Sequence, residues 1–225
     1  DVKISEFSKK FFDKDNDFKS IRNGIAHADL SEYREKDKGT VLTKVKFCGL
    51  KDVETALYAA RCGAGYIGLV FAPGRRQVTA QIALAISNAI HSLDKRPKLV
   101  GVFVNEEAAQ INRLGDCYGL DGVQLSGEED MEDCRLITKP IINTVHVTQG
   151  SIAVEISARV AEICNHGFSC LLDTKIGGKF GGTGKTFNWQ IAAEVANRHP
   201  VIVAGGLTPQ NVGWWIGEAK PWGVD

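Results

Sequence analysis

From about residue 43 onward, one pattern of hydrophobic and polar positions recurs along the chain. Short runs rich in Val, Ile and Leu alternate with longer Ala-rich stretches in which apolar residues recur at helical spacing. This alternation is typical of repeated strand–helix units built around a parallel sheet. The predicted strands are 44–47, 66–70, 99–104, 122–125, 141–147, 170–172, 201–204 and 222–225.

Amphipathic stretches between these strands predict helices. Thr79 and the pair Thr208-Pro209 stand where a helix N-cap and first turn are expected, before the second and the seventh helix. The predicted helices are 52–61, 80–93, 107–118, 129–137, 152–164, 189–197 and 210–217.

Eight strands in strict alternation with helices predict an α/β fold of the closed (β/α)8 type, the TIM barrel. An open dinucleotide-binding sheet is expected to carry G-x-G-x-x-G after its first strand, and this sequence has no such motif there. In a closed barrel the carboxyl ends of the strands and the loops after them form the active face. Candidate functional residues are therefore sought just past each strand.

Composition narrows the class of protein further. The 225 residues fit one large domain, and 27 basic residues balance 27 acidic ones, so the charge indicates neither a nucleic-acid nor a membrane-surface partner. No apolar run approaches the roughly 20 residues of a membrane span, and a cytoplasmic enzyme is expected. The six cysteines form no C-x-x-C pair and the histidines no H-E-x-x-H motif, so neither a disulfide framework nor a metal or other cofactor is expected.

Two strand ends carry side chains suited to acid–base chemistry. Cys48 follows the first strand and precedes Gly49, which would place a thiol on the active face. A single cysteine there is more often a packing residue. Asp173 follows Leu171 and Leu172 at the end of the sixth strand, where a general acid or base would stand, although a helix cap or loop ion pair is an equal alternative.

Glycine-rich segments follow the sixth and seventh strands, at 178–187 and at Gly205-Gly206. Two such segments in successive late loops favour a barrel phosphate site. The first is not a nucleoside-triphosphate loop, because Lys179 occupies the place of the glycine that G-x-x-x-x-G-K-[ST] requires. After the second strand, Arg75 and Arg76 could clamp a carboxylate or simply lie in solvent.

Taken together, these segments resemble the phosphoribosylanthranilate isomerases of tryptophan biosynthesis. The resemblance implies a cofactor-free barrel that converts N-(5-phosphoribosyl)anthranilate to 1-(2-carboxyphenylamino)-1-deoxyribulose 5-phosphate by an Amadori rearrangement, as a monomer or homodimer. An aldose-to-ketose shift needs one acid and one base, which agrees with the residues above. The matching stretches are 46–50, 68–78, 100–106, 121–125, 171–175, 181–189, 204–207 and 221–225.

The resemblance also implies roles for individual residues. Cys48 would be the base that removes the C2′ proton, Asp173 the acid that opens the furanose ring, and Arg76 the partner of the anthranilate carboxylate. The remaining implied substrate-binding residues, most of them for the phosphate, are Gly182, Thr183, Gly184, Gly205, Gly206 and Asp225.

The chain departs from the family pattern in two places. Ser126 stands where the family has a histidine, and the family's Val-Ser-Ser-Gly-Val-Glu segment does not follow the last predicted strand. Residues 15–28 resemble the family's last helix, which suggests a circular permutation with 1–40 as the eighth helix plus linker and 41–225 as the barrel, in a single domain. The alternative is that residues 1–40 are an unrelated extension.

Three other functions are weighed against the isomerase. An indole-glycerol-phosphate synthase would favour catalytic lysines and glutamates, and a pentose-phosphate epimerase would favour paired aspartates with metal-binding histidines. The pair Cys48 and Asp173 fits neither enzyme. A non-catalytic or impaired sugar-phosphate-binding barrel stays open, because the strand-eight phosphate loop is altered.

Overall fold

A computed structural model describes residues 44–148, 150–176, 179–180 and 189–225 of the chain. The proposed permuted helix and linker at 1–40 lie outside the described residues. The phosphate-loop residues Gly182, Thr183 and Gly184 lie outside them as well.

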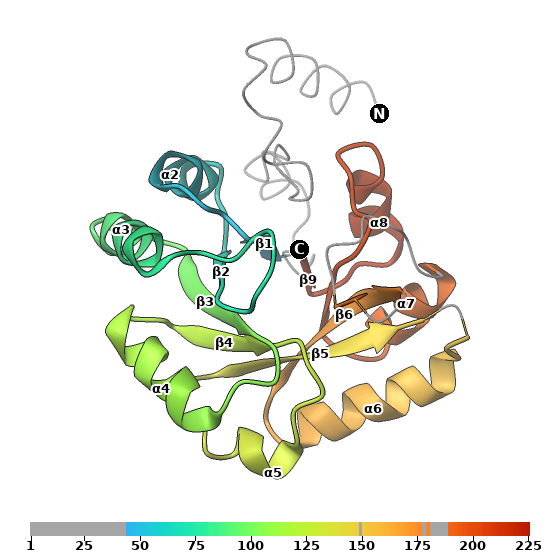
Figure 1. The fold of residues 1–225 in the computed structure, drawn as a ribbon. Coiled ribbons are helices and arrows are strands. Elements are labelled where there is room, and N and C mark those ends of the chain that lie inside the picture. Colours follow the sequence, from blue (N-terminus) through green and yellow to red (C-terminus); the bar gives the residue numbers. More distant parts are fainter. Residues whose placement is uncertain (1–43, 149, 177–178, 181–188) are drawn as a thin grey trace.

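Within the described ranges, eight parallel strands close into a ring. They follow one another in the order β5-β4-β3-β2-β1-β9-β8-β6, and pairing of β5 with β6 completes the closure (Figure 1). Each strand predicted from the sequence is found, which confirms the barrel. The strands of the ring are β1 (Lys44–Cys48), β2 (Tyr66–Val70), β3 (Lys98–Phe103), β4 (Gly122–Leu125), β5 (Ile141–Val147), β6 (Ser169–Ile176), β8 (Val201–Val203) and β9 (Gly223–Val224).

The sixth strand differs most from its prediction, while the bounds of the other strands of the ring agree within one residue at either end. The sequence placed the end of the sixth strand at residue 172, but β6 continues to Ile176 and pairs antiparallel with β7 (Lys179–Phe180), a strand that was not predicted. The polar run Asp173-Thr174-Lys175 carries no hydrophobic signal, so the pattern could not extend the strand through it. Asp173 therefore lies within a strand rather than in the loop after it.

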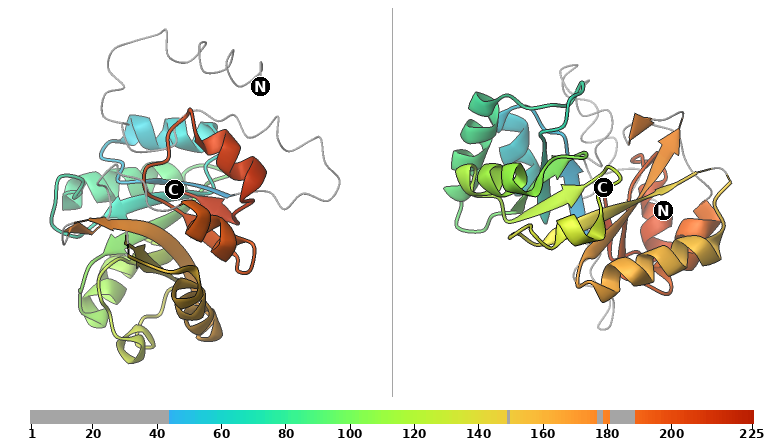
Figure 2. Two further views of the ribbon diagram at one scale, coloured as in Figure 1. Left: turned by 90° about the vertical axis from the view of Figure 1, so that its right-hand side faces the viewer. Right: turned by 60° about the horizontal axis from the view of Figure 1, so that its bottom comes forward.

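The helices lie on the outer side of the ring (Figures 1 and 2). Thr79 caps the second predicted helix as expected, since its hydroxyl accepts a hydrogen bond from the backbone of Ile82 at 3.3 Å. None of the helices among the described residues is long and apolar enough to cross a membrane. Their bounds are α2 (Val53–Arg61), α3 (Ala80–His91), α4 (Ala108–Cys117), α5 (Met131–Cys134), α6 (Ala153–Asn165), α7 (Trp189–Ala196) and α8 (Val212–Glu218).

Most helices are shorter than the sequence predicts, and the local cause is visible at the start of α8 and at the end of α5. α8 begins at Val212 instead of 210, because Thr208 and Asn211 first form a turn in which the Asn211 side chain accepts from the Thr208 backbone at 2.8 Å. α5 ends at Cys134, because the next three residues close tighter bonds to the carbonyl three positions back.

Side-chain alternation along the strands separates two apolar clusters. An inner cluster fills the ring and comes from strand residues, while a larger outer cluster joins the other strand faces to the helices. The inner cluster consists of Val100, Ile142, Leu171, Ile202 and Ala204, with Tyr66 and Trp222 packed against it. These positions identify the face of each strand that points into the lumen.

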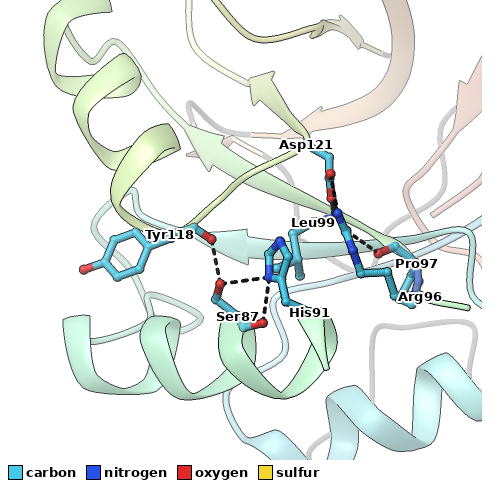
Figure 3. A network of polar contacts seen from close by, with 7 residues as sticks. All are labelled: Ser87, His91, Arg96, Pro97, Leu99, Tyr118 and Asp121. Atoms are coloured by element: carbon cyan, nitrogen blue, oxygen red, sulfur yellow. Dashed lines mark hydrogen bonds and ion pairs between the residues drawn. The ribbon is translucent and has the colours of Figure 1, made fainter. Parts of the chain in front are cut away.

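At the amino-terminal end of the barrel, a polar network ties the segments that lead into β3 and β4 (Figure 3). The Arg96 guanidinium donates two hydrogen bonds to Asp121, at 2.6 and 2.9 Å, and Asp121 accepts a third from the backbone of Leu99 at 2.8 Å. Nearby, the Ser87 hydroxyl donates to the carbonyl of Tyr118 at 2.7 Å. This end of a barrel usually serves stability rather than chemistry.

Candidate active site

Strand β1 carries the charged and thiol groups of the site. Val45 and Phe47 belong to the outer cluster, so Lys46 and Cys48 face the lumen. Lys46 is 1% exposed, the most deeply buried charged side chain in the described part of the chain. A charge buried this deeply requires a partner, because leaving water costs an ion several kcal/mol, on the order of the whole stability of a domain.

Asp225 is that partner. Parallel pairing of β1 with β9 brings the end of β9 level with Lys46, and the Lys46 ammonium donates to the Asp225 carboxylate at 2.5 Å. Burial alone would lower the pKa of Lys46. The charge of Asp225, the neighbouring Cys48 and hydrogen bonds to both outweigh burial and raise this pKa, so the ammonium stays protonated.

The Cys48 thiol occupies the same space as this ammonium. Gly68 of β2 lies opposite Cys48 in the register, and a Cβ added at Gly68 would lie 2.8 Å from the Cys48 sulfur and 3.2 Å from the Lys46 nitrogen. Glycine at this position therefore makes room for both groups. The nearby Cys48 also contributes to raising the pKa of Lys46.

The surroundings of Cys48 act on its ionisation in opposite directions. Burial raises the pKa of the thiol most strongly, and the charge of Asp225 adds to this effect. The cations of Lys46 and Arg76 lower the pKa, but the net shift is upward. The uncharged thiol is thus the resting form, and the two cations are the groups that favour the thiolate.

Arg76 reaches the site from the loop after β2. Its guanidinium donates to the backbone carbonyl of Cys48 at 3.4 Å. Its side chain lies over Gly49, where an added Cβ would meet the Arg76 Cδ at 2.7 Å and where φ is +80°, so glycine is required there on both grounds. The preceding Arg75 is exposed. Of the arginine pair, it is Arg76 that lies beside Cys48.

Asp173 faces the lumen from the other side of the ring. It stands two residues beyond Leu171 of the inner cluster and so points to the same face of β6. In the ring, β9 and β8 separate β6 from β1. Asp173 is half-buried and lies level with His146 of β5 in the parallel register. A carboxyl group and a thiol therefore approach the lumen from well-separated strands.

A polar network lines the lumen between β4 and β5. The Gln124 amide donates to the Ser126 hydroxyl at 2.9 Å, and that hydroxyl lies 3.1 Å from the Thr144 hydroxyl. The His146 Nε2 lies 2.9 Å from the Ser126 carbonyl oxygen. Sequence reasoning identified Ser126 but missed the other three residues. Polar residues at alternate positions of an otherwise apolar strand, as at Thr144 and His146, were the available signal.

Gly205 and Gly206 form the turn that follows β8. Their φ angles are +91° and +72°, in the region that favours glycine, and the Asn211 side chain donates to the Gly206 carbonyl at 3.0 Å. They lie at the carboxyl end of the barrel, as the sequence predicts. The described ranges contain no group of three or more residues that could hold a metal ion.

A comparison with known proteins identifies the family. The family model for N-(5′-phosphoribosyl)anthranilate isomerase matches residues 45–225. The chain belongs to the phosphoribosylanthranilate isomerase family. A curated phosphoribosylanthranilate isomerase from Dehalococcoides mccartyi is 44% identical over 188 residues, which cover 82% of this chain and 85% of the relative.

Solved phosphoribosylanthranilate isomerases share the fold. The crystal structure of the enzyme from Thermotoga maritima superposes with a TM-score of 0.69 at 35% identity, and the match covers 81% of this chain and 86% of the other. Another phosphoribosylanthranilate isomerase structure, with a TM-score of 0.66 at 32% identity and the same coverage, is a complex with reduced 1-(o-carboxyphenylamino)-1-deoxyribulose 5-phosphate. A further structure of the Thermotoga maritima enzyme is described as monomers made from a dimeric protein.

Proposed function

We propose that this chain isomerises N-(5-phosphoribosyl)anthranilate to 1-(2-carboxyphenylamino)-1-deoxyribulose 5-phosphate, for tryptophan biosynthesis, in the cytoplasm. The observation that carries the proposal is a thiol on β1 and a carboxyl group on β6 facing one barrel lumen, in a member of the isomerase family. The relative that binds a reduced form of the product supports the substrate class.

In the first step of the proposed reaction, Asp173 acts as the general acid. Its carboxyl proton passes to the furanose ring oxygen, and the C1′–O bond breaks as the anthranilate nitrogen donates its lone pair to C1′. The ring opens to an iminium ion, and Asp173 is left as a carboxylate. A half-buried carboxyl group on the lumen face suits this role, because it can reach a bound sugar while water is partly excluded.

In the second step, Cys48 acts as the general base. The thiol first loses its own proton to solvent, and the resulting thiolate removes the proton from C2′. The electron pair of the broken C–H bond forms the C1′–C2′ double bond of an enolamine and neutralises the iminium nitrogen. The enolamine then becomes the ketone as the 2′-hydroxyl proton is lost and C1′ gains one. No atom is gained or lost overall, and the reaction needs no oxidant or reductant.

The charged ends of the substrate have separate partners in this proposal. Arg76 pairs with the anthranilate carboxylate, since its guanidinium already lies beside Cys48 and is half-buried. The backbone N–H groups of Gly205 and Gly206 bind the phosphate, together with Gly182, Thr183 and Gly184. Asp225 lies in the lumen and is bound to Lys46, so its contribution to substrate binding is indirect.

The proposal is tested by following anthranilate fluorescence as phosphoribosylanthranilate is consumed. The parent chain is expected to turn over, and Cys48→Ala and Asp173→Ala are each expected to lose about 10²–10⁴-fold in kcat, the usual contribution of a general acid or base. Cys117→Ala is the matched control, because Cys117 is an exposed cysteine on α4. It should retain full activity.

Two results would contradict the proposal in different ways. A parent chain that binds the reduced product analogue without turnover would be a non-catalytic or impaired sugar-phosphate-binding barrel. Full activity in Cys48→Ala or Asp173→Ala would reject the assigned acid–base pair while leaving the isomerase activity intact.

A further inference from the structure

The presence of a buried ion pair between Lys46 and Asp225 is not explained by a gain in stability. It lies within a lumen whose neighbouring positions are filled by apolar side chains, among them Val100 and Ile202. Replacing a buried ion pair with apolar residues of similar volume is often neutral or stabilising, so such a pair is a weak way to hold a fold together. Its position next to a proposed base suggests a role in the chemistry.

The arrangement places three ionisable groups in a row. Asp225, directly after β9, binds the Lys46 ammonium at 2.5 Å, and Cys48 lies two residues further along β1 on the same lumen face. Gly68 of β2 leaves the space in which the ammonium and the sulfur meet. The ammonium is therefore fixed from one side by a carboxylate and directed at the thiol on the other.

We propose that Lys46 is a positioning residue of the isomerase site, held by Asp225 so that its ammonium orients the sulfur of Cys48 and stabilises the thiolate that accepts the C2′ proton. This inference rests on the proposed function, because that function assigns Cys48 as the base.

Asp225 has two opposed effects in this arrangement. It keeps Lys46 protonated in spite of burial, and its own negative charge disfavours a second anion at Cys48. The charged groups that act on Cys48 from the elements around it are Lys46 on β1, Arg76 after β2 and Asp225 directly after β9. Neutralising Asp225 in the parent therefore removes both the repulsion and the anchor of Lys46, whereas in Lys46→Met it removes the repulsion alone.

The experiment measures the alkylation of Cys48 by iodoacetamide as a function of pH, with the modified peptide quantified by mass spectrometry. Only the thiolate reacts, so the rate reports ionisation without any need for turnover. Lys46→Met is expected to slow alkylation near neutral pH by about tenfold or more, since the nearby positive charge has been removed. Asp225→Asn is expected to accelerate alkylation more in the Lys46→Met background than in the parent, where the loss of the anchor opposes the loss of the repulsion.

The chain offers two internal references. Cys117 is exposed and should react at one rate in every variant. Cys170 is buried, and burial raises its pKa to about 12, so its labelling would reveal a variant that has unfolded. Lys46→Arg retains the positive charge and should recover part of the parental rate.

The outcomes separate this inference from the proposed function. Slower alkylation in Lys46→Met, partial recovery in Lys46→Arg and a larger Asp225→Asn effect without Lys46 than with it support the positioning role, whether or not the parent turns over. Equal rates in the parent and the folded Lys46→Met, or an Asp225→Asn effect of the same size in both backgrounds, would overturn it, even if kcat/KM falls. Should Lys46→Met fail to fold, a parental alkylation rate in Lys46→Met/Asp225→Asn overturns it instead.

Discussion

Two of the barrel's ion pairs each join one basic side chain to one aspartate but differ in their surroundings. Arg96 and Asp121 meet at the amino-terminal end, with side chains 29% and 24% exposed (Figure 3). Lys46 and Asp225 meet in the lumen toward the carboxyl-terminal end, with side chains 1% and 9% exposed. The first pair has two parallel hydrogen bonds and lies between segments that enter neighbouring strands. The second has one and lies next to a thiol.

The difference shows how position determines what an ion pair contributes. Near the surface, Arg96 and Asp121 retain part of their hydration, so a bidentate bond between two loop segments adds a modest stabilisation. In the lumen, the loss of hydration offsets the attraction between Lys46 and Asp225. We infer that the exposed pair serves the fold and the buried pair serves the chemistry at Cys48.

The largest effect on stability is expected from Lys46→Met. This change leaves the Asp225 carboxylate buried without its cation, which typically costs about 3–5 kcal/mol of unfolding free energy. Urea unfolding monitored by circular dichroism measures that cost. The second change, Asp225→Asn in the Lys46→Met background, should restore the lost unfolding free energy. A double variant as unstable as the single one would contradict this explanation.

Gly68→Ala tests the shared space beside the buried pair. The new Cβ would lie 2.8 Å from the Cys48 sulfur and 3.1 Å from the Cys48 Cα. Because the Cα is a backbone atom, moving it away costs more than moving a flexible side chain. We expect a loss of about 1–3 kcal/mol from overpacking and a fall in kcat/KM of about 10²-fold from the displaced sulfur. Gly217→Ala is the control, because an added Cβ there meets nothing within 4 Å. Full activity in Gly68→Ala would count against the described position of the thiol.

Asp121→Asn removes the anion of the exposed pair. The side chain loses its charge-assisted bonds to Arg96 and weakens the bond from the Leu99 backbone. An unfolding free energy lower by about 1–2 kcal/mol is expected, a reduced value for charged hydrogen bonds because the pair is partly exposed. The kcat/KM measured under the same conditions should stay within about twofold of the parent. A much larger fall in kcat/KM would mean that this end of the barrel also affects the site.

The smallest expected effect is a pH dependence of the stabilisation that the Asp121 carboxylate provides. Burial would raise the pKa of Asp121, but the hydrogen bonds from Arg96 and Leu99 and the charge of Arg96 lower it overall. The stabilisation is therefore fully present above the ordinary pKa of an aspartic acid and is lost as the pH falls through the lowered value. The stability difference between the parent and Asp121→Asn should shrink below about pH 4. A stability difference between the parent and Asp121→Asn that stays constant from about pH 6 to about pH 3 would contradict this dependence on ionisation.

Most of the fold could be predicted from the sequence, because its signal is local. Each strand of the ring is a short apolar run between amphipathic helices, and the alternation alone predicts a closed barrel. The extension of β6 was missed, because Asp173 and Lys175 interrupt the apolar pattern while the backbone continues to pair, first with β5 and then with β7. Pairing between strands distant in sequence overrides local composition there.

The site was predictable only in part. Polar side chains near the ends of apolar strands drew attention to Cys48, Arg76 and Asp173, and the segments around them resemble a known family. Lys46 was not predicted as a functional residue, since a lysine near the start of a strand is ordinarily exposed. Its burial follows from the closure of the ring, which brings β9 and Asp225 beside β1. No pattern within either strand encodes that contact.

The most direct test of the comparison is to neutralise each pair completely and to measure kcat/KM and the unfolding free energy on the same preparations. We expect Lys46→Met/Asp225→Asn to keep or raise the unfolding free energy while kcat/KM falls by about tenfold or more. Arg96→Met/Asp121→Asn should lose about 1–2 kcal/mol while kcat/KM stays near the parental value. Parental kcat/KM in the first double variant would contradict the account, because the buried pair would then have no part in the chemistry.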